Sequence, residues 1–358
     1  MADRIYLDHA ATTVMLPEAV EAVTAGMRDW ANPSSPHAEG RAARAALEKA
    51  RREVAAAYGW AHELVFTSGA SESLQMALGR SMAPRRLISA VEHDSVLRHS
   101  EGAQVLPVDP DGILRMDALQ AALAAGPRAL VGVQWANSET GVRQPIAEIA
   151  AHVHAADGIL LVDAAQMPTR ADEAVLRHAD LVAVSAHKRG GPPGIGALLV
   201  RDFGVLLPMG GQEKGYRAGT ENLPGALGYS VAVQVTEDLA PMAALRARLE
   251  VAILAAGGDV VAAKCPRSPL IGAYRMPGVS AAAQLIRFDL AGISVSAGSA
   301  CSSGSMRPSH VLGAMGWEEP ALREVVRVSF GRGTTEAEVD AFTTLWRQIA
   351  DEARTRAA

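Results

Sequence analysis

Residues 60–200 alternate short apolar runs with longer stretches of helical periodicity. The apolar runs that predict β-strands lie at residues 63–67, 86–90, 129–134, 159–163, 181–185 and 195–200. Several of them carry Val, Ile or Leu at consecutive positions, which is typical of strands that helices cover on both faces. The helical patterns that separate most of them lie at 71–79, 146–156 and 172–177.

Repeated strand–helix–strand units predict an α/β fold with a mostly parallel sheet flanked by helices. The run at 195–200 follows the run at 181–185 after only a short loop, so we expect these two strands to pair antiparallel. An earlier stretch rich in Ala, Arg and Glu, residues 40–58, predicts one long helix.

The pattern changes after about Asn222. One long helix over 225–256 is predicted there, followed by strands at 295–297 and 326–329 and a terminal helix at 335–354. This segment has the elements of a second, smaller domain.

Chain length also favours two domains, because 358 residues exceed the roughly 250–300 that one hydrophobic core usually holds. We expect a large domain over residues 14–240 and a small α+β domain over 241–358. Residues 1–13 are expected to pack with the small domain.

Composition excludes several classes of protein. The chain is 49% apolar and 20% charged with a formal net charge of -5, so nothing favours binding to nucleic acid or to an anionic membrane. No stretch approaches the roughly 20 apolar residues of a membrane span, and the first residues lack a secretory pattern, so we expect a cytoplasmic protein. Cys265 and Cys301 are too few for a disulfide framework, so any role of a cysteine is expected to be chemical.

Polar residues follow several of the predicted strands, and the carboxyl ends of parallel strands meet at one edge of a sheet, where ligands bind. Ser68-Gly69-Ala70-Ser71 follows the first run and precedes a helix, which favours an anion such as phosphate; a plain helix cap is the alternative. His93 follows the second run and could stack on a flat ring or move protons, or be an ordinary surface histidine.

Asp163 and Lys188 end two neighbouring strand runs, one strand–helix–strand unit apart. Each has a structural alternative, an ion pair or helix cap for Asp163 and an extended surface side chain for Lys188. Together, an acid for a pyridinium nitrogen and a lysine for an aldehyde make a minimal pyridoxal-phosphate site. The Ser68–Ser71 loop and His93 would complete it with a phosphate site and a ring contact.

Cys301 lies in a Gly/Ser-rich segment, which favours a reachable, reactive thiol, although a lone cysteine is more often a small buried hydrophobe. Cys265 has no such setting. Arg327 interrupts an apolar strand pattern and needs a carboxylate, which could belong to the protein or to an amino-acid substrate. The histidine spacings do not predict a metal site.

Taken together, these motifs resemble the cysteine desulfurases of the NifS/IscS type, in the class V aminotransferase group of fold-type I pyridoxal-phosphate enzymes. The resemblance runs nearly end to end. The matching segments are Tyr6-Leu-Asp-His-Ala-Ala-Thr-Thr13, Asn32-Pro-Ser-Ser35, Thr67-Ser-Gly-Ala-Ser-Glu72, Glu92-His93, Asn137-Ser-Glu-Thr-Gly141, Val162-Asp-Ala-Ala-Gln166, Ser185-Ala-His-Lys188, Arg217-Ala-Gly-Thr-Glu-Asn222, Gly298-Ser-Ala-Cys301 and Arg327-Val-Ser329.

The resemblance implies how the ring of pyridoxal 5'-phosphate would be held. Lys188 would form the Schiff base with its aldehyde, Asp163 would pair with the pyridine nitrogen, and Gln166 would hydrogen-bond O3′. His93 would stack on the ring and handle protons. The phosphate would be bound by Ala70, Ser71, Ser185 and His187, and by Thr220 from the other subunit of a homodimer.

The resemblance also implies the substrate chemistry. L-Cysteine would be the substrate, held by Arg327 and Asn137, and Cys301 would take its sulfur as a persulfide for an iron–sulfur scaffold or another acceptor protein. No intrinsic metal is expected, beyond a transient iron–sulfur contact through the persulfide. The family commonly has a second Asn where this chain has Ser138, so the cofactor or substrate contact at Ser138 would differ.

Three other functions remain open at the level of the sequence. A selenocysteine lyase and an ordinary class V aminotransferase would use the same cofactor site, although an aminotransferase has no need of Cys301. A non-catalytic binding protein of a sulfur pathway could keep the fold, although the presence of Lys188, Asp163 and Cys301 argues against it.

Overall fold

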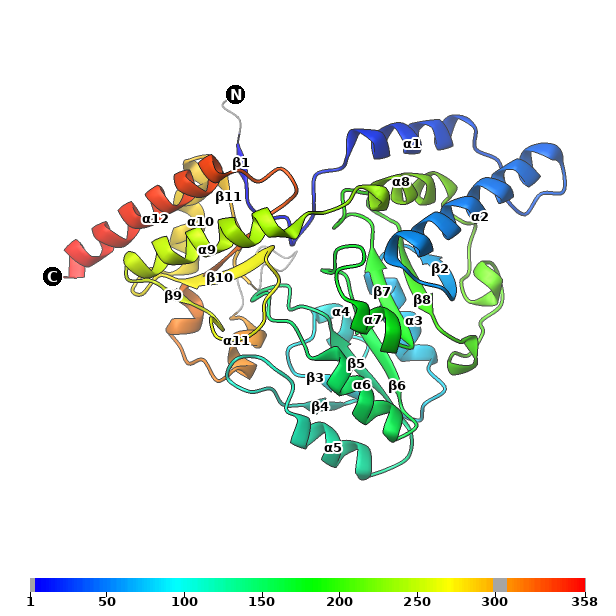
Figure 1. Cartoon of the computed structure of the whole chain (residues 1–358), viewed down its shortest axis with the longest axis horizontal. Coiled ribbons are helices and arrows are strands. Elements are labelled where there is room, and N and C mark those ends of the chain that lie inside the picture. Colours follow the sequence, from blue (N-terminus) through cyan, green and yellow to red (C-terminus); the bar gives the residue numbers. More distant parts are fainter. Residues whose placement is uncertain (1–3, 299–307, 358) are drawn as a thin grey trace.

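The structure is a computed structural model in which residues 4–298 and 308–357 are described. Its largest element is a seven-stranded sheet (Figure 1). The strands, in spatial order, are β2 (Glu63–Thr67), β8 (Gly196–Val200), β7 (Leu181–Ser185), β6 (Ile159–Asp163), β5 (Ala129–Gln134), β3 (Arg85–Ser89) and β4 (Gln104–Leu106). β8 runs antiparallel to both of its neighbours, and the other pairs are parallel, as predicted.

Alternate side chains of the strands pack into separate cores on the two faces of this sheet. One face buries Val162 and Val182 against α2 (Ala38–Tyr58), α6 (Ile146–Ala155) and α8 (Leu223–Gln234). The other buries Leu161 and Leu181 against α3 (Ala70–Arg80). Because both faces are covered, β6 and β7 are buried at every position, which explains their continuous apolar runs.

The remaining elements build a second core on a three-stranded antiparallel sheet of β12 (Val325–Ser329), β10 (Ile271–Arg275) and β9 (Asp259–Val260). The helices α9 (Leu239–Ala255), α10 (Ala281–Leu290) and α12 (Glu336–Ala357) lie beside this sheet (Figure 1). The N-terminal strand β1 (Ile5–Tyr6) pairs with β11 (Ile293–Ser294), and Leu7 and Ala10 are buried in the same core. The domain boundary at residues 240/241 stays a prediction.

The other described helices lie around these layers. They are α1 (Pro17–Arg28), α4 (Asp94–Leu97), α5 (Met116–Ala124), α7 (Glu173–His178) and α11 (His310–Ala314), with 3₁₀ turns at Phe203–Val205, Glu213–Gly215 and Ala321–Glu324. Of these helices, α1 packs against α8. Among the described residues, no helix is long and apolar enough to cross a membrane.

The prediction of one long helix over 225–256 is wrong, because the chain leaves the helix between α8 and α9. Asp238 begins α9 by accepting a hydrogen bond from the backbone N–H of Ala240. Glu237 turns inward, where its carboxylate contacts Nη1 of Arg189 at 2.9 Å and Nη2 of Arg332 at 3.0 Å. A continuous helix would remove both the cap and the position of this carboxylate, so the buried ion pairs favour the break.

Glu237→Ala should destabilise the protein strongly, because it leaves the guanidinium of Arg189, which is only 5% exposed, without its carboxylate. We expect a loss of about 3–5 kcal/mol in the free energy of unfolding, measured by urea titration followed by circular dichroism. Glu173→Ala is the matched control: it removes a carboxylate that is 85% exposed beside Arg177 and should change little. Equal effects of the two substitutions would contradict a stabilising role for Glu237.

Candidate active site

The carboxyl ends of β6 and β7 bring the predicted acid and lysine together. Asp163 is the last residue of β6 and pairs with Ala183 of β7, so Ser185 ends β7 two residues further on and Lys188 lies in the loop beyond. Asp163 is 8% exposed, and its Oδ1 accepts a hydrogen bond of 2.9 Å from the backbone N–H of Ala165. This bond fixes the carboxylate at the edge of the sheet.

The environment of Lys188 favours a reactive amine. Burial lowers its pKa to about 8, with the positive charges of Arg327 and Arg189 acting in the same direction and Asp163 and Asp8 opposing them. A substantial fraction of the amine is therefore neutral near physiological pH and able to attack an aldehyde. The backbone is held as well, because Thr13 donates a hydrogen bond of 3.2 Å from Oγ1 to the carbonyl of Lys188.

The turn between β2 and α3 has the geometry of an anion site. Gly69 precedes the helix with φ of 153°, a conformation that L side chains rarely adopt. Gly196 of the adjacent strand allows a close approach, because a Cβ there would lie 2.6 Å from the Cα of Gly69. Ala70 and Ser71 then begin α3, whose first backbone N–H groups and dipole favour a negative charge.

Two histidines lie at the same edge with lowered basicity. Burial, together with Lys188, lowers the pKa of His93, although Asp163 opposes this. Burial, Lys188 and Arg189 lower the pKa of His187 to about 4. Both rings are therefore neutral at physiological pH, and Nδ1 of His93 accepts the backbone N–H of Ser95 at 3.1 Å while the ring of His187 contacts Oγ1 of Thr12 at 3.2 Å.

Arg327 reaches the site from β12 and has protein partners. Its Nη2 pairs with Oδ1 of Asp8 at 2.5 Å, and its Nη1 donates to the backbone carbonyl of Ser138 at 3.0 Å. Its Nε, by contrast, has no hydrogen-bond partner among residues 4–298 and 308–357, although Arg327 is only 8% exposed. Of the two expectations for this arginine, the protein salt bridge is observed, and the contact with a substrate carboxylate stays a prediction.

Gln166 and Asn137 are buried, and the structure gives both side chains partners within the protein. Gln166 donates from Nε2 to the carbonyl of Ala10 at 2.9 Å. Asn137 donates from Nδ2 to the carbonyl of Val91, and its Oδ1 accepts from the backbone N–H groups of Glu139 and Thr140. In this state the Asn137 amide shapes the turn after β5, and its contact with a substrate stays a prediction.

One predicted residue, Thr220, lies apart from this group. Thr220 is exposed in the loop before α8, which Arg217 attaches to the start of α3 through a 3.0 Å contact with Glu72. Cys301 lies outside the described residues.

Sequence reasoning missed three acidic side chains at the site: Asp8, Glu92 and Glu139. Glu92 is fully buried, its pKa is raised well above the usual range by burial and by Asp163, and its Oε1 accepts the backbone N–H of Gln134 at 2.9 Å. All three lie inside motifs that carry the family resemblance, so the motifs marked the segments without indicating the contacts.

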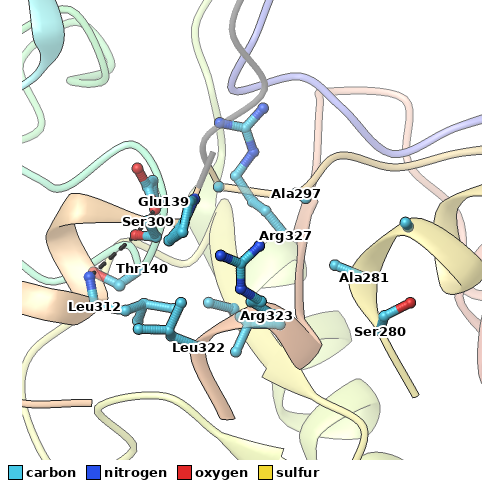
Figure 2. A pocket seen from close by; sticks show the side chains of 15 residues that line it. Glu139, Thr140, Ser280, Ala281, Ala297, Ser309, Leu312, Leu322, Arg323 and Arg327 are labelled. Carbon is cyan, nitrogen blue, oxygen red and sulfur yellow. Dashed lines mark hydrogen bonds between the residues drawn. The ribbon is translucent and has the colours of Figure 1, made fainter. Parts of the chain in front are cut away.

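A cavity of about 150 Å³ lies beside Arg327, between the turn after β5 and the second core (Figure 2). Its lining includes Glu139, Ser309, Arg323 and Arg327. Lys188 does not line it; this lysine lines a smaller space together with Gln166, His9 and Arg189. Arg327 therefore lines the larger cavity and also acts electrostatically on Lys188 at the sheet edge.

Comparison with known proteins places this arrangement in a family. The family described as "Aminotransferase class-V" matches residues 5–342. A "Cysteine desulfurase" of Cereibacter sphaeroides is 38% identical, with 98% of this chain and 97% of that protein covered. The structure of a NifS-like protein from Rickettsia africae is 30% identical, with a TM-score of 0.87 over 97% of this chain and 99% of that one.

A second solved structure, titled "SspA in complex with cysteine", is 30% identical with a TM-score of 0.77, covering 92% of this chain and all of that one. The relatives and the solved structures thus agree with the family match over nearly the full length. The chain belongs to the class V aminotransferase family, in the group that contains the NifS-like and IscS-like cysteine desulfurases.

Proposed function

We propose that this protein is a pyridoxal-phosphate-dependent cysteine desulfurase, which converts L-cysteine to L-alanine and keeps the sulfur on Cys301. The observation that carries the proposal is the position of Lys188, whose pKa is lowered to about 8, just beyond β7 and close enough for its charge to interact with buried Asp163 at the end of β6. The full-length similarity to cysteine desulfurases supports the reaction, and the solved SspA structure was obtained with cysteine.

The described residues fit pyridoxal 5'-phosphate. Asp163 supplies a fixed carboxylate for a pyridinium nitrogen, Lys188 an amine for the aldehyde, and the Gly69–Ser71 turn an N-terminal helix site for the phosphate. Further proposed phosphate ligands are Ser185 and His187, with Thr220 of a second copy in a homodimer. The neutral ring of His93 suits stacking, and Gln166 suits a hydrogen bond to the ring oxygen. When bound, the cofactor supplies an electron sink that labilises the bonds at the substrate Cα.

The chain's own groups would then divide the work. Lys188 as the free amine would remove the proton from Cα, which a lowered pKa favours. Nε of Arg327, which has no partner within the part of the chain that the structure describes, would help bind the substrate carboxylate beside Asn137 and Ser138. His93, neutral at physiological pH, would accept or return a second proton.

The sulfur transfer is balanced without a further reactant. L-Cysteine and the Cys301 thiol give L-alanine and a Cys301 persulfide: the Cβ–S bond of the substrate breaks, an S–S bond forms, and the thiol proton is conserved among the products. The persulfide would pass to an iron–sulfur scaffold or another acceptor protein. These partners, the homodimer and a cytoplasmic location stay predictions.

The alternatives are a selenocysteine lyase, an ordinary class V aminotransferase and a non-catalytic sulfur-pathway binding protein. Alanine release from L-cysteine, compared with release from L-selenocysteine and with amino transfer to a 2-oxo acid, separates the first two from a desulfurase. A purified protein that lacks the cofactor's visible absorption would favour the third. The identity of the relatives favours the desulfurase.

Reactivity of Lys188 should follow pH in the cofactor-free protein. Because burial lowers its pKa to about 8, acetylation of Lys188 by a trace of acetic anhydride should rise with pH and level off above about 8, well below the range of an ordinary lysine. Peptide mass spectrometry measures it, with the 70% exposed Lys49 as a reference in the same sample.

Asp163→Asn should move that midpoint to lower pH, because the negative charge of Asp163 raises the pKa of Lys188. Asp29→Asn, at an exposed position, is the matched control and should leave it in place. A midpoint that rises in Asp163→Asn would show that the two groups do not interact as the structure indicates.

Lys188→Ala should abolish the visible absorption band of the bound cofactor near neutral pH and reduce alanine formation to background. Borohydride reduction of the wild-type protein followed by peptide mapping should place the cofactor on Lys188. Lys49→Ala is expected to keep both the band and the activity. Retention of the band in Lys188→Ala would reject the assignment of this lysine.

Cys301→Ser should lose alanine production from L-cysteine and the persulfide detected by mass spectrometry. Cys265→Ser should keep both, because Sγ of Cys265 is engaged in its own turn at 3.3 Å from the carbonyl of Ala262, and burial raises the pKa of its thiol. Full alanine production by Cys301→Ser would refute the persulfide mechanism.

A further inference from the structure

Glu139 lies in the turn after β5, close to Arg327 but without any role in the proposed chemistry. Glu139 is 7% exposed, and its backbone is fixed because its N–H donates to Oδ1 of Asn137 at 2.9 Å. The preceding carbonyl, that of Ser138, accepts from Arg327. The turn thus holds Glu139 at a constant position relative to the arginine.

The carboxyl group of Glu139 binds the start of α11. Oγ of Ser309 donates to Oε2 of Glu139 at 2.6 Å and accepts the backbone N–H of Leu312 at 3.1 Å, so one hydroxyl both caps the helix and ties it to the turn (Figure 2). The next residue of α11 is held by a different partner: Nε2 of His310 lies 2.9 Å from the backbone carbonyl of Glu92.

The carboxyl group of Glu139 also contacts Gly298, which precedes residues 299–307. A Cβ placed on Gly298 would lie only 2.1 Å from Oε2 of Glu139, so the backbone of Gly298 packs against this oxygen and a side chain there would displace the carboxyl group. Two residues earlier, Ser296 exchanges backbone hydrogen bonds of 3.2 and 2.6 Å with Arg327. Glu139 therefore contacts Gly298 and Ser309, which flank residues 299–307.

Burial makes these contacts costly to lose. It raises the pKa of Glu139, with Ser309, His310 and Arg327 opposing the rise. An acidic group in this setting, deprived of Ser309, would stay desolvated without a partner. The two contacts are therefore expected to persist through turnover.

We infer that Glu139 is a positioning residue: its carboxyl group fixes Gly298 and Ser309, the two ends of the segment that carries Cys301, to the turn that anchors Arg327. The inference rests on the proposed function, in which Cys301 attacks the sulfur of a substrate held beside Arg327. Its effect is to give the nucleophile and the substrate anchor one common support.

The test separates attack by Cys301 from substrate binding. In Glu139→Ala, the single-turnover rate of persulfide formation on Cys301, followed by mass spectrometry, should fall about tenfold or more, since small displacements of a reacting group cost up to ~100-fold. The apparent affinity for L-cysteine, read from the change in cofactor absorption, should stay within about twofold. The rate at which iodoacetamide alkylates Cys301 in the cofactor-free protein, measured relative to Cys265, is a readout independent of activity. This rate should differ between Glu139→Ala and the wild-type protein.

Conservative and matched variants sharpen the result. Glu139→Gln keeps a carbonyl oxygen for Ser309 and should restore most of the rate, whereas Ser309→Ala should reproduce the loss of Glu139→Ala. Glu318→Ala changes an exposed glutamate shortly after α11 and should behave as wild type in every assay.

A double-substitution cycle tests the contact with Gly298. Gly298→Ala alone should slow persulfide formation, because its methyl group would press on Oε2 of Glu139. In the Glu139→Ala background that oxygen is absent, so adding Gly298→Ala should cost little more. Additive losses would overturn the proposed contact.

Two other outcomes overturn the inference. One is a persulfide rate within twofold of wild type in Glu139→Ala; the other is a parallel loss of L-cysteine affinity and of thermal stability, which indicates a general structural role. Failure of the proposed function is recognised separately: Cys301→Ser would then release alanine at the wild-type rate, whatever the Glu139 variants do.

Discussion

The site depends on the parallel pairing of β6 with β7, because that pairing sets Asp163 against the strand that leads to Lys188. Neighbouring parallel strands end at the same edge of a sheet. An acid and a base at the ends of two such strands are therefore close in space although they are separated in the sequence. The two charges also depend on each other. Burial lowers the pKa of Lys188 and the negative charge of Asp163 raises it. The resulting pKa of about 8 allows the lysine to be either protonated or neutral near physiological pH.

The site also depends on carboxylates that balance the positive charge at this edge of the sheet. The positive charges of Arg189 and Arg327 lower the pKa of Lys188, and those of Lys188 and Arg189 lower the pKa of His187. Their balancing carboxylates come from distant parts of the chain: Asp8 from the N-terminal segment pairs with Arg327, and Glu237 from the break between α8 and α9 pairs with Arg189. The N-terminal segment and the helix break are therefore parts of the site's electrostatics as well as of the fold.

Periodicity was sufficient to predict the layers but not these long-range contacts. The central strands were readable because burial on both faces demands apolar residues at every position, and the order of Asp163 and Lys188 along the chain followed from that. Strand β10 was missed, since Gly272 and Ala273 interrupt its apolar pattern; Gly272 is needed because a Cβ there would collide with the hydroxyl of Tyr274. The break at Glu237 was missed because the partners that favour it, Arg189 and Arg332, are remote in sequence.

Ser138, at which the sequence departs from the family it resembles, has a backbone role in the structure that is separate from its predicted ligand contact. At this position, where the resemblance implies a second asparagine, Ser138 presents its backbone carbonyl to Arg327, a contact that does not depend on the side chain. The anchoring of the arginine can therefore tolerate serine, and only contacts made by the missing amide itself would be weakened. The turn keeps its shape through Asn137, which binds the N–H groups of Glu139 and Thr140. Substitution at Ser138 should thus alter ligand contacts while leaving the support provided by Glu139 in place.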